Sequence, residues 1–236
     1  MRRFWDAATV GRGEDGLVVL LDGKPMRIPG GSALLLHNEA LADAIAAEWQ
    51  VAGGANGGEM SMDDVPLTRL AGTAQDRVGP NRLAVAAGLA AYGESDLLCY
   101  RAERPHALVV RQARDWQPWL DWAERTHGVR LVPTEGIRHV AQDTASLDRV
   151  GRLYAGMPAY ALAALGIAVP AMGSAVLGLA LDAGALPADE AYRVSSLDEL
   201  FQREQWGEDA EATIRLAQVL ADLQLAERFL QLSRTG

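Results

Sequence analysis

The sequence predicts an α+β fold in which a small β-rich N-terminal domain precedes a larger α-helical domain. Near the N-terminus, short β-rich stretches flank an Asp-Gly turn signal. Beyond residue 60, apolar residues recur at helical spacing instead. A glycine-rich run from Gly53 to Gly58 separates the two patterns and is the best domain boundary. We therefore predict a β-rich domain with one helix at residues 1–60 and an α-helical domain at residues 61–236.

The β-rich part begins with a predicted hairpin. Leu17 to Leu21 is a β-rich run, and Asp22-Gly23 is a strong signal for a tight turn. The chain is expected to return antiparallel from Lys24 to Ile28, until Pro29-Gly30-Gly31 breaks the ladder. A further strand is predicted from Ala33 to Leu36.

Helices account for most of the remaining chain. The first is predicted from Glu39 to Trp49, with Asn38 as its N-cap and Leu41, Ile45 and Trp49 on one face. One short extended segment is expected near Val129 to Pro133. The later predicted helices are Leu67–Val78, Asn81–Tyr92, Pro105–His127 with a kink at Pro118, Thr144–Tyr154, Pro158–Ile167, Pro170–Ala183, Pro187–Gln205 and Asp209–Ser233.

An uncharged stretch from Leu153 to Leu181 is long enough to suggest a membrane span. Pro158, Pro170 and several glycines interrupt it, and much of the rest is alanine, which has a modest transfer free energy. We therefore expect two short buried helices here and no membrane span.

The net charge, the cysteine content and the N-terminal segment indicate which kind of protein and which compartment to expect. The net charge is −9 and Lys24 is the only lysine, which argues against nucleic-acid binding because that requires a dense positive patch. Cys99 is the only cysteine, so an internal disulfide is excluded. Met1 to Val10 lacks the apolar run of a secretory leader. We expect a bacterial cytoplasmic protein, or a mature protein of the mitochondrial matrix.

The sequence predicts no catalytic residue, cofactor site, metal site or small-molecule substrate. Gly11 to Gly16 has the spacing of a dinucleotide-binding loop, but a β-rich stretch follows it where a helix is required, so a hairpin loop is the better interpretation. The four histidines show no metal-ligand spacing, and Cys99 lies in an apolar run where a thiol is inert. A small carboxylate-dependent hydrolase stays open as an alternative, because its carboxylates would meet in space rather than in sequence.

Three tryptophans, Trp116, Trp119 and Trp122, lie close together in a predicted helix. Core packing is the favoured interpretation, because a platform that stacks sugars or bases would normally come with separated polar contacts.

The segment from Ser196 to Glu211 is unusual in its charge pattern. At 100° per residue, Leu197, Leu200 and Phe201 share one helical face that should point to the core. A second face carries four polar or aromatic residues, and three more acids, Glu208, Asp209 and Glu211, follow Gly207. The face is either a solvated acidic surface with the tryptophan folded under the next helix, or a partner-binding patch with an aromatic anchor among carboxylates. The candidate partner-binding residues are Asp198, Glu199, Gln202, Trp206, Glu208 and Asp209. Asp198 and Glu199 are predicted to be exposed.

Motifs along nearly the whole chain resemble one family, the assembly chaperones for the α subunit of the catalytic head of ATP synthase, found in mitochondria and alphaproteobacteria. The motifs are Arg3-Phe4-Trp5, Leu20-Leu21-Asp22-Gly23-Lys24-Pro25, Ala40-Leu41-Ala42, Ala46-Ala47-Glu48-Trp49, Pro66-Leu67-Thr68-Arg69-Leu70-Ala71, Asp76-Arg77-Val78, Ser95-Asp96-Leu97-Leu98-Cys99-Tyr100-Arg101-Ala102, Thr134-Glu135-Gly136, Gly173-Ser174, Leu197-Asp198-Glu199 with Gln202, and Trp206-Gly207-Glu208-Asp209.

The resemblance implies a β-rich N-terminal domain, a helical C-terminal domain and no enzymatic activity. It also implies a function, which is to hold the unassembled α subunit and prevent its aggregation until the β subunit replaces the chaperone. The functionally important acidic position of the family falls on Asp198, which is an aspartate where mitochondrial members carry glutamate.

Overall fold

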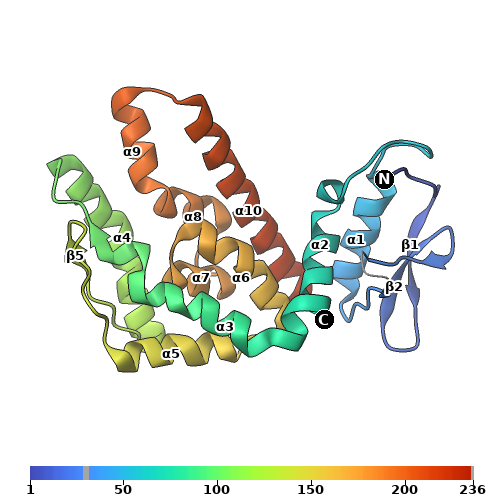
Figure 1. Cartoon of the computed structure of the whole chain (residues 1–236), viewed down its shortest axis with the longest axis horizontal. Helices are drawn as coiled ribbons and strands as arrows, with labels where there is room; N and C mark the ends of the chain where they lie inside the picture. Colours follow the sequence, from blue (N-terminus) through green and yellow to red (C-terminus); the bar gives the residue numbers. More distant parts are fainter. Residues whose placement is uncertain (29–31, 235–236) are drawn as a thin grey trace. The chain divides into compact units, whose positions relative to one another are not determined.

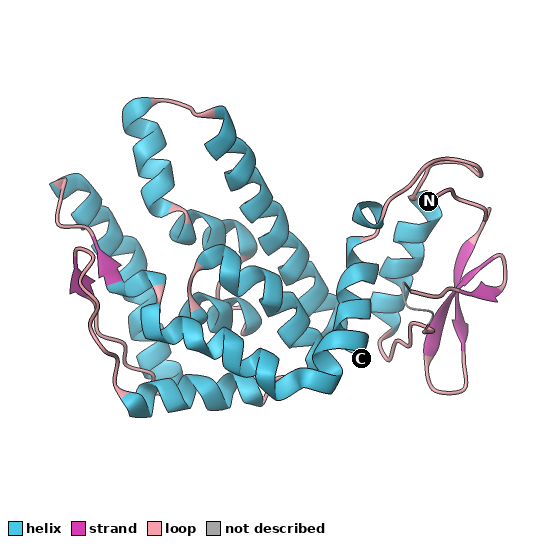
Figure 2. Ribbon diagram, viewed as in Figure 1, coloured by secondary structure: helices cyan, strands magenta, loops and turns pink. Residues whose placement is uncertain are grey.

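The computed structural model describes residues 1–28 and 32–234, and these form two compact units (Figure 1). The first unit contains residues 1–81 together with residues 159–164 and 228–234. The second contains residues 82–158 and 165–227. Helices predominate and the strands are few and short (Figure 2), so the predicted α+β class is confirmed. The predicted break at Pro29-Gly30-Gly31 lies outside the described residues.

The sheet of the first unit is antiparallel, in the order β1 (Ala8–Arg12), β2 (Leu17–Leu21), β3 (Lys24–Pro25). Asp22 and Gly23 both have positive φ, 47° and 78°, as a two-residue hairpin turn of the favoured type requires. The predicted hairpin is therefore confirmed, whereas β1 was not predicted as a strand. β3 is shorter than predicted, although the amide of Met26 still donates to the carbonyl of Val19. Ala33 to Leu36 makes only isolated bridges.

Helix α1 (Glu39–Val51) packs against β1 and β2 and supplies the core of the first unit. The side chain of Asn38 accepts a hydrogen bond from the amide of Leu41, which confirms the predicted N-cap. Leu41, Ile45 and Trp49 are buried as predicted. The indole of Trp5 packs on Trp49 with ring centroids 5.0 Å apart and donates to its carbonyl, which ties the N-terminus to the helix.

Arg3 is buried and organises the loop that follows α1. Its guanidinium donates to five backbone carbonyls, those of Trp5, Asp6, Gln50, Ala52 and Gly54. The last three lie at the C-terminal end of α1, where the helix dipole favours a cation. A Cβ on Gly58 would lie 1.8 Å from the carbonyl oxygen of Gly53, so only glycine fits there.

The glycine-rich run is thus packed within the first unit, which continues to Asn81. The division into domains at residue 60 stays a prediction. Helix α2 (Pro66–Thr73) follows the short 3₁₀ helix η1 (Met62–Asp64) and continues as a π-helical turn, Ala74–Val78, in agreement with the predicted helix. The carboxylate of Glu48 accepts hydrogen bonds from the amides of Leu67 and Thr68, and burial raises its pKa.

The second unit is helical except for one pair of very short strands. The two strands, β4 and β5, pair in parallel, and no strand forms over Val129 to Pro133. Its strands are β4 (Tyr100–Arg101) and β5 (Thr134–Glu135), and short 3₁₀ turns lie at Ala91–Ser95 and Leu97–Cys99. Its helices are α3 (Arg82–Ala90), α4 (His106–His127), α5 (Thr144–Ala155), α6 (Ala159–Met172), α7 (Ala175–Asp182), α8 (Ala188–Ser195), α9 (Leu197–Trp206) and α10 (Ala210–Arg234). The first residues of α6 and the last residues of α10 belong to the first unit, as does a 3₁₀ turn at Gly79–Asn81.

Two helix boundaries differ from the prediction. The break in the apolar stretch falls at Gly173-Ser174, because Gly173 has φ 64° and the Ser174 side chain caps α7 by accepting from Leu177. Pro170 stands in the last turn of α6 instead of starting a helix. The single helix predicted from Pro187 to Gln205 is two helices, which meet at Ser196.

Helix α7 forms the centre of the second unit. Every residue from Ala175 to Leu181 is buried, as expected of a helix that is apolar all round. Two short helices therefore occupy the uncharged stretch, as predicted. Within residues 1–28 and 32–234, the structure contains no helix with the length and apolarity to cross a bilayer.

A buried carboxylate lies at the N-terminus of α7. Asp96 is fully buried and accepts hydrogen bonds from the amides of Leu98 and Val176, at 3.1 Å each. Burial raises its pKa to about 6, against the opposing effect of bonds from Val176, Ser174, Leu98 and Ala175. The carboxylate links the turn before β4 to the start of the central helix, where the helix dipole favours a negative charge.

Replacing Arg3 should destabilise the protein. Arg3→Met puts an apolar side chain of similar length in its place but removes the guanidinium donor from five carbonyls, of which that of Asp6 keeps the side-chain amide of Gln50 as a donor. The free energy of unfolding should therefore fall by about 3 kcal/mol or more. Urea unfolding measures this change. Arg2→Met, at the exposed neighbouring position, is the matched control and should change stability by less than about 0.5 kcal/mol. Equal urea midpoints for the two variants would contradict the role assigned to Arg3.

Asp96 should make stability depend on pH in a defined direction. Its folded-state pKa of about 6 exceeds the value of about 3.9 expected in the unfolded chain, so the folded state holds a proton that the unfolded state releases. As pH rises from about 4 to 7, the wild type should therefore lose about 2 kcal/mol of unfolding free energy relative to Asp96→Asn. Urea unfolding of both proteins across this range measures the shift. A constant difference would contradict it.

Candidate partner-binding site

Helix α9 carries most of the predicted partner-binding residues, and its buried face fixes its orientation. Leu197 and Phe201 are buried as predicted, whereas Leu200 is only half-buried. Ser196 ends α8 and immediately begins α9, so the two helices share a junction without a loop.

Asp198 faces α4 and is half-buried, which corrects the prediction that it is exposed. The amide Nε2 of Gln112 donates to Oδ1 of Asp198 at 2.7 Å. Gln112 is only 1% exposed, and its own Oε1 accepts from the amide of Ala102 at 2.7 Å. Burial raises the pKa of Asp198, the Gln112 bond opposes the rise, and the negative charge of Glu199 adds to it. Asp198 is thus the end of a buried polar chain from β4 through α4 to α9.

The other five predicted residues line one groove between α9 and α10. We call it the acidic groove, and its volume is about 450 Å³. Its lining comprises Glu199, Gln202, Arg203, Trp206, Gly207, Glu208, Asp209, Glu211, Ala212, Arg215 and Leu216. The fold therefore brings together Glu199, Gln202, Trp206, Glu208 and Asp209, and it places Asp198 on the other side of the helix.

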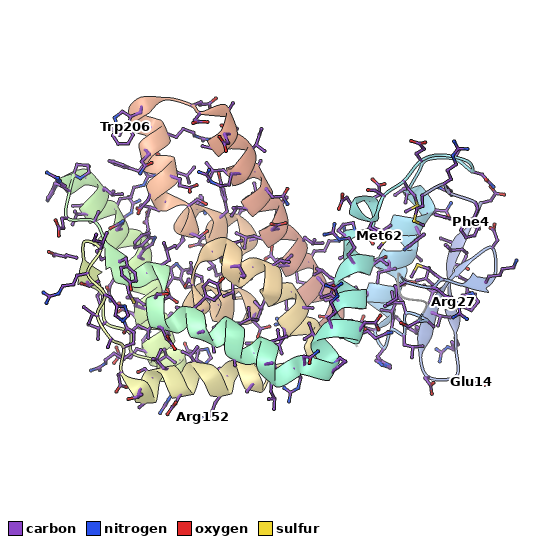
Figure 3. All side chains as sticks on the ribbon, in the orientation of Figure 1. Phe4, Glu14, Arg27, Met62, Arg152 and Trp206 are labelled. Carbon is purple, nitrogen blue, oxygen red and sulfur yellow. The ribbon has the colours of Figure 1, made fainter. Side chains whose placement is uncertain are left out.

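Trp206 is the exposed aromatic of this groove. Its side chain is 80% exposed at the end of α9 (Figure 3), so it is not folded under the next helix. Gly207, with φ 90°, ends the helix directly after it. Ile214, on α10, is 72% exposed. Large apolar side chains left this open are typical of interaction surfaces.

Four carboxylates and two guanidinium groups line the acidic groove, so negative charge is in excess. Glu199 pairs with Arg215 at 3.3 Å. Asp209 also has a structural role, because its Oδ1 accepts from the amides of Glu211 and Ala212 at 2.7 and 3.2 Å and thereby caps α10. Glu208 is exposed, and its carboxylate has no ion-pair partner among the described residues.

Comparison with known proteins identifies the family. The family model described as ATP12 chaperone protein matches residues 2–124. The chain belongs to the ATP12 chaperone family. The crystal structure of Atp12 from Paracoccus denitrificans is similar over 99% of this chain and 98% of that chain, with 42% identity and a TM-score of 0.93.

Two further relatives agree. The Atu1473 protein from Agrobacterium tumefaciens has 38% identity and a TM-score of 0.90 over 98% of this chain and 85% of its own. The mitochondrial protein atp12 of Schizosaccharomyces pombe is 25% identical in an alignment 225 residues long that covers 89% of this chain and 75% of that protein. The resemblance to an ATP synthase assembly chaperone family and the predicted fold class are therefore confirmed.

The alternative chemistries gain no support in this ATP12 family chain. The described residues contain no group of three or more potential metal ligands. Cys99 is buried, and burial raises its pKa to about 12, so the thiol is unreactive. Gly11 and Arg12 belong to β1, and the amide of Gly13 donates to the carbonyl of Gly16, which is the predicted hairpin loop. The carboxylates that gather in the acidic groove are exposed and have two arginines among them, unlike the pair of carboxylates in a hydrolase.

Sequence reasoning missed the residues that complete the site from other helices. Gln112 and Arg111 on α4 contact α9, the latter through an ion pair with Glu204 at 2.7 Å. The spacing of Gln112 four residues before Trp116 would have placed it on the buried face of α4. Of the three clustered tryptophans, only Trp116 is fully buried, and its indole donates to the carbonyl of Val194; the other two are half-buried.

Asp198 should tolerate loss of charge but not its reversal. Asp198→Asn keeps an oxygen that accepts from Gln112, whereas Asp198→Lys places a cation against a buried donor. We expect the lysine variant to lose about 2 kcal/mol of unfolding free energy and the asparagine variant to lose less than about 1. Urea unfolding checks both values, and Glu199→Lys, at an exposed neighbour, is the control with the same charge change. If both lysine variants were equally stable, the bond to Gln112 would contribute nothing.

Proposed function

We propose that this chain binds the unassembled α subunit of the ATP synthase catalytic head and prevents its aggregation until the β subunit takes its place. Membership of the ATP12 chaperone family and the match to Atp12 over 99% of the chain support this partner. A subunit awaiting its neighbour exposes apolar surface that would otherwise aggregate. The chain acts by binding and carries out no catalysis, in the cytoplasm of a bacterium or in the mitochondrial matrix.

The acidic groove is the proposed contact, and the 80% exposure of Trp206 is the observation that carries this assignment. Tryptophan is the side chain most often found as an energetic anchor in protein interfaces. Glu208 and Glu211, at the same groove, would accept hydrogen bonds from arginine or lysine of the client. The groove thus fits an apolar side chain of the client flanked by cationic ones.

Asp198 acts differently in this proposal. Its carboxylate already bonds Gln112, so it holds α9 in position rather than serving as the outermost contact. A variant at Asp198 would then weaken client binding indirectly, by moving the helix that carries Glu199, Gln202 and Trp206.

Trp206→Ala should weaken capture of the α subunit without unfolding the chaperone. Loss of an interface anchor costs about 2 kcal/mol, so affinity should fall about 30-fold. The measurement is co-expression with the α subunit, followed by recovery of the soluble complex and titration of the purified partners. Ile137→Ala, at a fully exposed aliphatic residue outside the groove, is the matched control and should bind like the wild type.

Two results would count against the proposal. If the wild-type chain neither formed a complex with the α subunit nor kept it soluble, the partner would be wrong. If the wild type bound and Trp206→Ala bound equally well, the α subunit would stand as partner but the acidic groove would not be its site.

A further inference from the structure

A second groove lies between α4, α8 and α9. Unlike the acidic groove, it is lined by more basic than acidic side chains. Three arginines line it, Arg111, Arg114 and Arg193, and its volume is about 350 Å³. We call it the arginine groove. Trp119 and Leu200 contribute apolar surface to its walls. In a chain whose acids outnumber its bases by nine, this groove is unusual in that its three arginines outnumber the two acids of its lining.

All three arginines line the same groove, and one of them binds a carboxylate there. Arg114 binds Asp115 through two hydrogen bonds, at 2.6 and 2.8 Å. Those bonds lower the pKa of Asp115, and the positive charges of Arg114, Arg111 and Arg193 lower it further.

Arg111 and Arg193 still have guanidinium N–H groups that can donate hydrogen bonds in this groove. Arg111 gives one hydrogen bond to Glu204, at 2.7 Å. Arg193 makes only a long bond, 3.4 Å, from Nε to the carbonyl of Asp189, and its guanidinium has no carboxylate within ion-pair distance among the described residues. A guanidinium has five N–H donors arranged to bind a carboxylate through two parallel bonds.

We propose that the arginine groove binds an acidic segment of the client protein, with a client carboxylate on Arg193 and the adjoining aliphatic or aromatic side chain against Trp119 and Leu200. This inference rests on the proposed function, because it adds a second contact to the same client. Bidentate carboxylate bonds are the strong class of hydrogen bond and also fix geometry.

The charge of the groove suits a carboxylate better than a polyphosphate. Two of the three arginines, Arg111 and Arg114, are already paired with carboxylates. The third guanidinium of the lining, that of Arg193, is without an ion pair among the described residues. One carboxylate matches that single guanidinium, whereas a di- or triphosphate would bring several negative charges against the acids already present. The half-buried Trp119 and Leu200 give the neighbouring apolar side chain a surface to cover.

The two grooves lie on different sides of α9, since Glu199 and Trp206 line one and Leu200 lines the other. A client that presents a basic element to the acidic groove and an acidic element to the arginine groove would bind in only one orientation. Complementary charge of this kind supplies specificity and encounter rate more than affinity.

A double charge reversal tests the inference. Arg114→Glu with Arg193→Glu changes two exposed side chains and leaves the Arg111 pair intact. We expect at least a tenfold loss of affinity for the α subunit, and a weaker dependence of the remaining affinity on salt. Arg152→Glu, on the exposed face of α5 (Figure 3), is the matched control and should bind like the wild type. Circular dichroism and urea unfolding confirm that the double variant is folded.

A photo-crosslinking residue at position 119 in the full-length chain identifies what enters the groove. In the complex with the α subunit, mass spectrometry should find crosslinks to a segment of net negative charge that contains an apolar residue. If the wild type fails to bind the α subunit, the proposed function and this inference both fall. If the wild type binds, and the double variant binds equally well or position 119 crosslinks only to basic segments, this inference alone is overturned.

Discussion

The second unit depends on how the chain satisfies a carboxylate buried beside its central helix. Helix α7 is apolar on every face, so its first amides must find acceptors without water. Asp96 supplies the acceptor from a turn about eighty residues earlier in the chain, and the same carboxylate holds the amide of Leu98. A negative charge is favourable at a helix N-terminus, but burying a carboxylate is costly. Asp96 is therefore stable in this position only while its hydrogen bonds to Leu98 and to Val176 are both made. The turn before β4 and the start of α7 are thereby fixed to each other.

Helix α4 connects this buried region to helix α9, which carries the proposed binding surface. Trp116 packs in the core and bonds the end of α8 through Val194, while Gln112, one turn earlier, accepts from Ala102 and donates to Asp198 on α9. A buried glutamine with both ends of its amide occupied tolerates little displacement of its partners. The position of α9 therefore follows from side chains of α4, and α9 in turn separates the acidic groove from the arginine groove. The resemblance places functional importance on Asp198, and the geometry offers a positioning role for it.

Local chemistry explains which parts of this architecture the sequence predicts. The Asp22-Gly23 turn and the Asn38 cap depend on a few adjacent residues, so they were predicted correctly. The boundary between α6 and α7 was predicted at Pro170 but lies at Gly173-Ser174. A proline in the last turn of a helix disturbs few hydrogen bonds, so it does not end the helix there. The stronger signal was a glycine in the αL conformation followed by a serine that caps the next helix. The helical wheel located the face of Trp206, but the partners of α9 lie on α4 and α10, and no local pattern pairs helices so far apart in sequence.

The proposed contact surface is charged where most protein interfaces are apolar, and this follows from what an assembly chaperone has to do. A permanent partner gains stability from a large apolar interface, whereas under the proposed function this chain must later yield its client to the subunit that takes its place. One exposed indole supplies a single anchor, and the carboxylates around it gain little net free energy because they give up water to bind. Complementary charge sets the orientation and the rate of capture instead. A site built from one aromatic and two oppositely charged grooves thus favours selective but reversible binding.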